Sequence, residues 1–220
     1  MMFLAIDTST LTAGVALLSA DALFVRRGRV TSHSDELLQM VSEVVAESGR
    51  SVRELAGVIC GAGPGSFTGL RIGLSTCKGL ALSVGCPLLL ISSLEALAAR
   101  SIDGPCLAVL DAHKGEVYAG VYEVAGGVPS LRGVERVLAP QTLIADLSNG
   151  SARTIVGDGV LAYPQLSVLG QSVDEDGSPH PRELIALGKM RLQAGEHTSL
   201  DQATPHYIRR SEAEILKDRR

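Results

Sequence analysis

The stretch Met-Phe-Leu-Ala-Ile-Asp-Thr-Ser-Thr-Leu-Thr-Ala-Gly-Val-Ala, at residues 2–16, decides the fold of this chain. Its apolar run predicts a buried strand that ends at Asp7, and the hydroxyl residues after Asp7 predict a tight turn before a second strand. The same order returns at 107–122, where an apolar run ends at Asp111 and a polar turn precedes another Ala-Gly-Val strand. The repetition predicts a duplicated α/β unit, and chance similarity of two hairpins stays open as the alternative.

The other segments extend both copies with strands and helices, and the pattern restarts near 101–105. We therefore predict two lobes, residues 1–102 and 103–220. Capping boxes begin helices after Ser51 and Ser92. The further predicted strands are 23–30, 57–61, 88–91 and 153–156, and the predicted helices are 34–49, 68–84, 94–100, 140–147 and one beginning at Pro181.

Composition and charge exclude several classes of protein. The chain has 220 residues, 45% of them hydrophobic, which is enough for a sizeable core. A net charge of −4, without basic runs flanked by aromatics, argues against an independent nucleic-acid binder. The start has no basic region before its short apolar run, and no later run is long enough to span a bilayer, so we expect a cytoplasmic protein that is not bound to membranes.

No metal site or disulfide framework is indicated. The cysteines are scattered without a Cys-x-x-Cys pair, and the histidines are dispersed among loops and helix ends. The glycine-rich loop at 61–69 matches neither a Walker A motif nor Gly-x-Gly-x-x-Gly, and it is not a Gly-x-Ser-x-Gly elbow. These residues therefore predict no catalytic nucleophile and no zinc or other metal site built from cysteine and histidine.

One set of residues is compatible with nucleotide binding. Asp7, Thr8 and Ser9 could form a phosphate loop of the kind found in actin-like ATPases, with Asp111 facing Asp7 across a cleft and the two carboxylates holding hydrated Mg²⁺. Weak ATP or ADP binding is the consequence of that interpretation. The alternative is that these aspartates only form turns at strand ends, as aspartates often do.

Several motifs spread over nearly the whole chain resemble the TsaB (YeaZ) family. The most specific is Gly-Pro-Gly-Ser-Phe-Thr-Gly-Leu-Arg-Ile-Gly at 63–73. The others are Ile-Asp-Thr-Ser at 6–9, His-Ser-Asp-Glu-Leu-Leu at 33–38, Leu-Asp-Ala-His-Lys-Gly-Glu-Val-Tyr at 110–118 and the tail Pro-x-Tyr-x-Arg-x-Ser-Glu-Ala-Glu at 205–214. His113 stands where many relatives have arginine, a small departure from the pattern.

The resemblance implies a duplicated actin-like, RNase H-like (ASKHA) fold and kinship with TsaD. That catalytic protein transfers a threonylcarbamoyl group with a metal held by a His-x-x-x-His pair. The equivalent positions here would be Ser93 and Leu97, and neither side chain can replace imidazole on a transition metal. The resemblance therefore implies a subunit that is not an enzyme. A metallopeptidase, as the older glycoprotease-like naming suggests, is a remote alternative.

The resemblance also implies partners: TsaD, the ATPase TsaE, a second copy of the chain when it is alone, and tRNA only indirectly. We expect two helices of the first lobe to meet TsaD, because small residues beside an aliphatic ridge permit close packing. The alternative is that both faces belong to the internal core. The predicted interface residues are Leu37, Leu38, Val41, Val45, Gly69, Arg71, Gly73, Cys77 and Ala81.

A rival hypothesis makes the protein an actin-like enzyme, such as a kinase, that uses ATP through Asp7, Thr8, Ser9 and Asp111. Tight binding of Mg-ATP with turnover would favour it, because a binding subunit requires neither.

Overall fold

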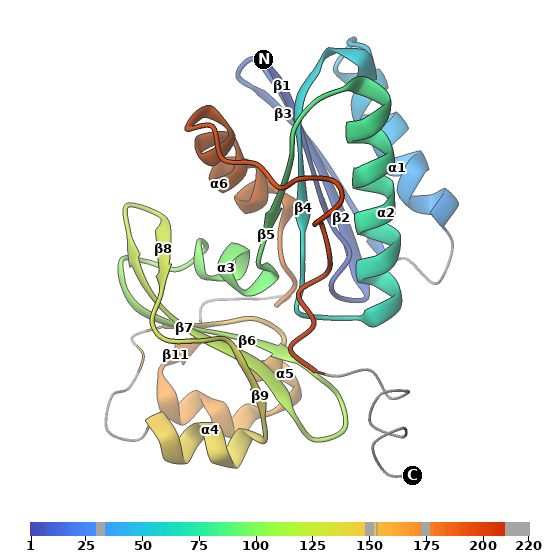
Figure 1. Cartoon of the computed structure of the whole chain (residues 1–220). Helices are drawn as coiled ribbons and strands as arrows, with labels where there is room; N and C mark the ends of the chain where they lie inside the picture. The colour runs from blue at the N-terminus through green and yellow to red at the C-terminus, as the bar shows by residue number, and fades with distance from the viewer. Residues whose placement is uncertain (30–33, 148–151, 153, 173–176, 210–220) are drawn as a thin grey trace.

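A computed structural model describes residues 1–29, 34–147, 152, 154–172 and 177–209, and it places two mixed β-sheets one above the other (Figure 1). The first sheet has the order β3 (Ala22–Arg29), β2 (Thr12–Ser19), β1 (Met2–Asp7), β4 (Leu55–Gly61), β5 (Leu88–Ile91). The second has the order β8 (Val128–Leu131), β7 (Val117–Ala125), β6 (Gly104–Asp111), β10 (Thr154–Val156), β11 (Gln171–Ser172), and β9 (Arg136–Leu138) also pairs with β7.

The two sheets repeat one topology. In each, the first two strands pair antiparallel, the third pairs antiparallel with the second, and the fourth and fifth add in parallel on the other side. The duplication predicted from sequence is therefore confirmed. The Ala-Gly-Val triplets are not equivalent, however, because Gly14 pairs with Asp7 whereas Gly120 pairs with Ala108, three residues before Asp111.

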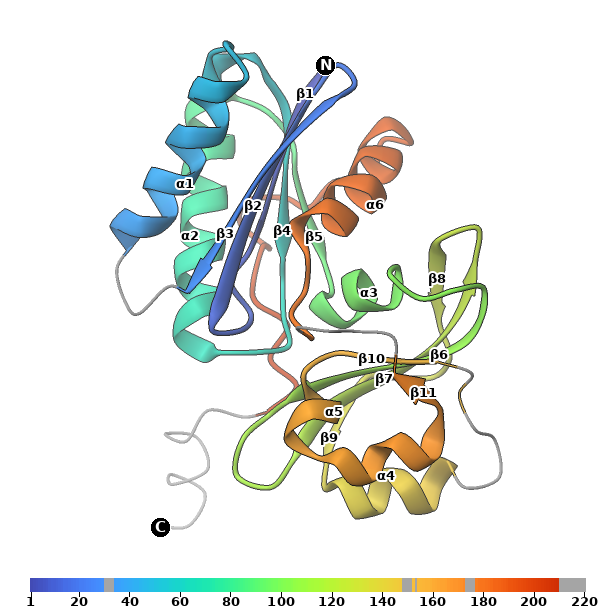
Figure 2. The same cartoon turned by 180° about the vertical axis from the view of Figure 1, so that it is seen from behind.

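The central strand β1 is buried on both faces. Leu4 and Ile6 join the core beneath α1 (Ser34–Glu47) and α2 (Phe67–Val84), whereas Phe3 and Ala5 join the core beneath α6 (Pro181–Gln193). This alternation follows from the two-residue period of a strand. Figure 2 shows α1 and α2 on one face of the first sheet and α6 on the other.

Helix α3 (Ser93–Ala98) lies between the lobes and packs on β6 and β7. Ser92 caps it as predicted, accepting from the backbone N–H groups of Leu94 and Glu95, but the Glu95 side chain pairs with Arg191 of α6 instead of completing the capping box. The Ser51–Glu54 capping box is complete and begins η1 (Val52–Glu54). The outer face of the second sheet is covered by α4 (Pro140–Leu147), α5 (Gly159–Ala162) and η2 (Pro164–Leu169).

The division at residues 102 and 103 is corrected by the position of α6. This helix packs against β1, β2, β4 and β5 of the first sheet, although it comes from the second half of the chain. Close contact at two glycines permits this, because a Cβ at Gly188 would lie 2.5 Å from Ile59 and one at Gly14 would lie 2.7 Å from Pro181. We call the first sheet with α1, α2 and α6 the N-lobe, and the second sheet with its helices the C-lobe.

The ends of the remaining predicted elements are confirmed to within three residues, and Val30 and Arg153 lie outside the described residues. None of the helices within the described ranges combines the length and apolar character that crossing a bilayer requires.

Candidate functional site

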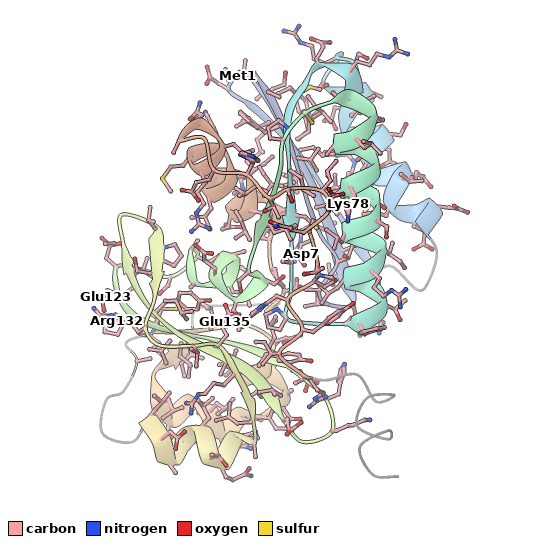
Figure 3. All side chains as sticks on the ribbon, viewed as in Figure 1. Met1, Asp7, Lys78, Glu123, Arg132 and Glu135 are labelled. Atoms are coloured by element: carbon pink, nitrogen blue, oxygen red, sulfur yellow. The ribbon has the colours of Figure 1, made fainter. Side chains whose placement is uncertain are left out.

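The carboxylate of Asp7, at the end of β1, is enclosed near the centre of the molecule (Figure 3). Its Oδ1 accepts hydrogen bonds from the backbone N–H and the hydroxyl of Ser9, at 2.8 and 2.6 Å. Its Oδ2 accepts from the hydroxyl of Ser93, at 2.8 Å. Asp7 is only 1% exposed, so these internal donors take the place of water.

Burial also governs the charge of Asp7. It raises the pKa of the carboxyl group above its ordinary value, and the hydrogen bonds from Ser9 and Ser93 oppose that effect. The neighbouring backbone leaves no spare volume, because a Cβ at Gly61 would lie 1.9 Å from Asp7 Oδ2. Glycine at position 61 is therefore required by the carboxylate beside it.

Thr8 and Ser9 hold the turn after β1 against the glycine-rich loop and α2. The Thr8 hydroxyl donates to the carbonyl oxygen of Gly69 at 2.7 Å, and the Ser9 carbonyl accepts from the backbone N–H of Ser66 at 2.7 Å. A Cβ at Gly73 would lie 2.2 Å from Thr8 Oγ1. Groups that a phosphate loop would offer to a nucleotide are here engaged in internal contacts.

Asp111, at the end of β6, does reach a cleft between the lobes. This cleft has a volume of about 850 Å³, and Ser9, Arg71 and Asp111 are among its lining residues. The Asp111 carboxylate accepts from the backbone N–H of His113 at 2.8 Å and lies 3.0 Å from the His113 ring. The predicted face-to-face arrangement of Asp7 and Asp111 is wrong, because Asp7 is buried behind the wall of the cleft.

Ser93 and Leu97 occupy interior positions on α3, and both are fully buried. The Ser93 hydroxyl donates to Asp7 and accepts from the backbone N–H of Gly63 at 3.2 Å, while Leu97 packs in the core under the second sheet. The Ser93 hydroxyl already makes two hydrogen bonds, and Leu97 has no atom that can bind a metal. The two side chains therefore do not fit a transition metal. Over the described part of the chain, no three His, Cys, Asp or Glu side chains gather as a metal site would require.

The predicted interface residues divide between the interior and the surface. Leu38, 49% exposed, and Arg71 lie outward, and Val45 and Gly69 are half-buried. The inward-facing residues pack against this chain's own sheet and turns, so in this structure they offer no surface to a partner; they are Leu37, Val41, Gly73, Cys77 and Ala81.

The outward face of α2 carries residues that sequence reasoning missed. Leu82 is 72% exposed, Ser75 and Gly79 lie on the same face, and a Cβ at Gly79 would meet no atom within 4 Å. The signal was the helical phase of α2. Once Leu70, Leu74 and Cys77 are assigned to the core, a period of 3.6 residues turns these three positions to the surface.

One sheet topology present twice, with a cleft between the copies, defines the actin-like class of α/β proteins. The model of a family described as TsaD, tRNA N6-adenosine threonylcarbamoyltransferase, matches residues 29–217. The chain is 33% identical over 230 residues to the tRNA threonylcarbamoyladenosine biosynthesis protein TsaB of Bacillus subtilis, covering 97% of this chain and 96% of that one. It is 32% identical to the TsaB of Escherichia coli, covering 97% and 96%. The chain belongs to the TsaB (YeaZ) family.

Solved structures agree with this assignment. YeaZ from Pseudomonas aeruginosa is 30% identical and matches with a TM-score of 0.82, covering 94% of this chain and 99% of that one. A second Pseudomonas aeruginosa structure, described as similar to the peptidase YeaZ, is 31% identical with a TM-score of 0.85 and the same coverage.

Proposed function

We propose that this chain is a non-catalytic subunit in the biosynthesis of threonylcarbamoyladenosine on tRNA, and that it acts by binding a TsaD-type catalytic protein in the cytoplasm. Family membership supports the pathway, because curated relatives carry that biosynthetic name. The observation that carries the non-catalytic role is the closed contact among Asp7, Ser9 and Ser93. Ser93 stands where a TsaD-type protein would need a side chain free to bind a metal, and here its hydroxyl is occupied by Asp7.

The same contact argues against the rival ATP-dependent enzyme. A phosphate loop must present free backbone N–H groups and hydroxyls to its ligand. Here the hydroxyls of Thr8 and Ser9 donate to Gly69 and Asp7, and the Asp7 carboxylate is walled in by Gly61. We therefore expect no tight binding of Mg-ATP or Mg-ADP.

The outward face of α2 is the docking surface that we propose for the catalytic partner. A glycine inside a helix lowers stability by about 0.5–1 kcal/mol relative to alanine, and no described residue lies close enough to Gly79 to require glycine there. Close approach of a partner helix would supply the reason, with Leu82 and Leu38 as apolar anchors and Arg71 at the edge. The same surface would pair two copies when the partner is absent.

A TsaE-type ATPase and tRNA complete the proposed assembly. The net charge of −4 gives this chain little attraction for the phosphates of tRNA, so we assign that contact to the partners. This subunit would then contribute by stabilising the catalytic protein against which it packs.

Binding can be tested by calorimetric titration of the TsaD-type protein from the same genome. Leu82→Glu places a charge at the most exposed leucine of the proposed surface and should weaken binding by about tenfold or more. Leu161→Glu is the matched control, because Leu161 is also exposed but lies on α5 of the C-lobe. Equal affinity of the Leu82→Glu variant and the wild type would refute the placement of the surface.

A further inference from the structure

The segment Ala203–Arg209 follows α6 and runs along the N-lobe towards the C-lobe, where it is drawn in red in Figure 1. Its contacts with the N-lobe are spread along its length. The Ala203 carbonyl accepts from Lys78 Nζ of α2 at 3.3 Å, and the His206 backbone N–H donates to the carbonyl of Ala62 at 2.7 Å. The ring of Tyr207 stacks on Phe67 with centroids 5.0 Å apart.

The same segment holds the C-lobe. Arg209 donates to the carbonyl of Ala112 at 2.6 Å, pairs with Glu116 and lies over the ring of Tyr118. His206 Nε2 lies 2.9 Å from Oε2 of Glu135. Consecutive residues of one segment therefore contact both lobes, and His206 touches the N-lobe with its backbone and the C-lobe with its ring.

Glu135 is the buried end of this contact and lies between the lobes (Figure 3). Its side chain is 5% exposed, and its Oε1 accepts from the hydroxyls of Ser92, at 2.5 Å, and Tyr122. Burial alone would raise the pKa of Glu135, but the contacts with His206, Ser92 and Tyr122 outweigh it and hold that pKa below its ordinary value. The contact with Glu135 in turn raises the pKa of His206.

Other charged groups lie on both sides of the pair of His206 and Glu135. Glu135 and His206 line a second pocket, of about 820 Å³, together with Glu95 of α3 and Arg191 of α6. Glu95 and Arg191 pair with each other, so they add little net charge beside Glu135. On its other side, His206 lines the interlobe cleft, whose charged or titratable lining groups include Arg71, Asp111, His113, Lys114, Asp158 and Arg209. In that group Asp111 contacts His113, and Arg209 pairs with Glu116, so neither is engaged with His206.

We propose that Ala203–Arg209 is a strap that locks the two lobes together, and that the charged pair of His206 and Glu135 makes the lock loosen as the pH rises above 6.5. The sign follows from which groups carry charge. A histidine whose pKa is raised in the folded protein contributes stability that is complete below pH 6.5 and is lost as the pH rises through the folded value. Once His206 is neutral, the buried Glu135 carboxylate loses its cationic partner.

Glu135 sets the opposite limit. Because its pKa is lowered in the folded protein, its contribution is present above pH 4.5 and is lost as the pH falls through the folded value. The lock should therefore be tightest in the mildly acidic window between these two transitions. The inference concerns the chain alone and does not depend on the proposed partner.

The chain contains no tryptophan, so Tyr207→Trp places its single tryptophan in the strap, where it can be excited selectively over the remaining tyrosines. In the full-length variant, we expect the emission to shift to longer wavelength and acrylamide quenching to increase as the pH is raised, with a midpoint above 6.5. Adding His206→Gln or Glu135→Gln should abolish this transition and leave the fluorophore quenchable at every pH. Circular dichroism would establish that each variant is folded.

His197→Gln is the matched control, because His197 is an exposed histidine whose ring contacts only the carbonyl of Gly195 among the described residues. That variant should keep the transition unchanged. A pH-independent signal in the reporter variant, or a transition that survives both His206→Gln and Glu135→Gln, would overturn the proposal.

Discussion

The three donors around Asp7 join segments that are far apart in the sequence. The Ser9 contacts close the turn after β1, while the Ser93 hydroxyl ties β1 to the start of α3, and Ser93 also accepts from Gly63 of the glycine-rich loop. Burial disfavours the charged form of this carboxylate, but its removal would leave the buried Ser9 and Ser93 donors without an acceptor, which costs more than the hydrogen bonds alone contribute. These contacts favour a structural role for Asp7.

Replacing this carboxylate tests its structural role. Asp7→Ala should lower the free energy of unfolding by about 1–3 kcal/mol, because the Ser9 and Ser93 donors lose their acceptor in a site closed to water. Urea unfolding followed by circular dichroism measures the change. Asp111→Ala is the comparison, and its loss should be smaller because the Asp111 side chain is 23% exposed. Equal losses in the two variants would contradict a special role for Asp7.

Helix α2 has two faces with different neighbours. Its inward face is shallow at Gly69 and Gly73, where the backbone and hydroxyl of Thr8 approach to distances that leave no room for a Cβ. Its outward face is open at Gly79, where a Cβ would have no described atom within 4 Å. The two faces explain why α2 contains glycines that a helix alone would disfavour.

A matched pair of substitutions separates these faces. Gly73→Ala should destabilise the chain by about 1–3 kcal/mol, because the added methyl group displaces Thr8. Gly79→Ala should instead stabilise it by up to about 1 kcal/mol, because the helix gains propensity without a clash. Thermal unfolding of both variants at one pH measures the difference. Destabilisation by Gly79→Ala in the isolated chain would mean that this face is not free.

The positions of strands and helices could be predicted from the sequence more accurately than the contacts between them. Apolar runs ending at Asp7 and Asp111 indicated the two hairpins, because a strand pattern is local. The four-residue spacing of Gly69, Gly73 and Cys77 predicted a groove for another helix, whereas the turn at Thr8 fills the space beside Gly69 and Gly73. It could not indicate that the approaching group is Thr8 of the same chain, since spacing reveals the depth of a groove and not what fills it.

At the scale of the molecule, the lobes are held by segments distant in sequence. Helix α6 returns from the second half of the chain to the first sheet, and the strap Ala203–Arg209 contacts both lobes. This is why the division at residues 102 and 103 is not a division in space. Pairings between residues about a hundred positions apart, such as Glu95 with Arg191, leave no trace in local sequence patterns.

This arrangement suits a subunit that works by contact. The Asp7 carboxylate is enclosed by internal hydrogen bonds, while α2 presents Leu82 and Gly79 at the surface. The proposed effect on tRNA modification therefore passes through the packed partner and through no chemical group of this chain.

Reconstituted transfer of the threonylcarbamoyl group to tRNA tests that claim most directly. With the TsaD-type and TsaE-type proteins present, the wild-type chain should support modification, Leu82→Glu should lose that support, and Leu161→Glu should keep it. The chain alone should give no product at any concentration. Modification of tRNA by the isolated chain, or full support from Leu82→Glu, would contradict the account.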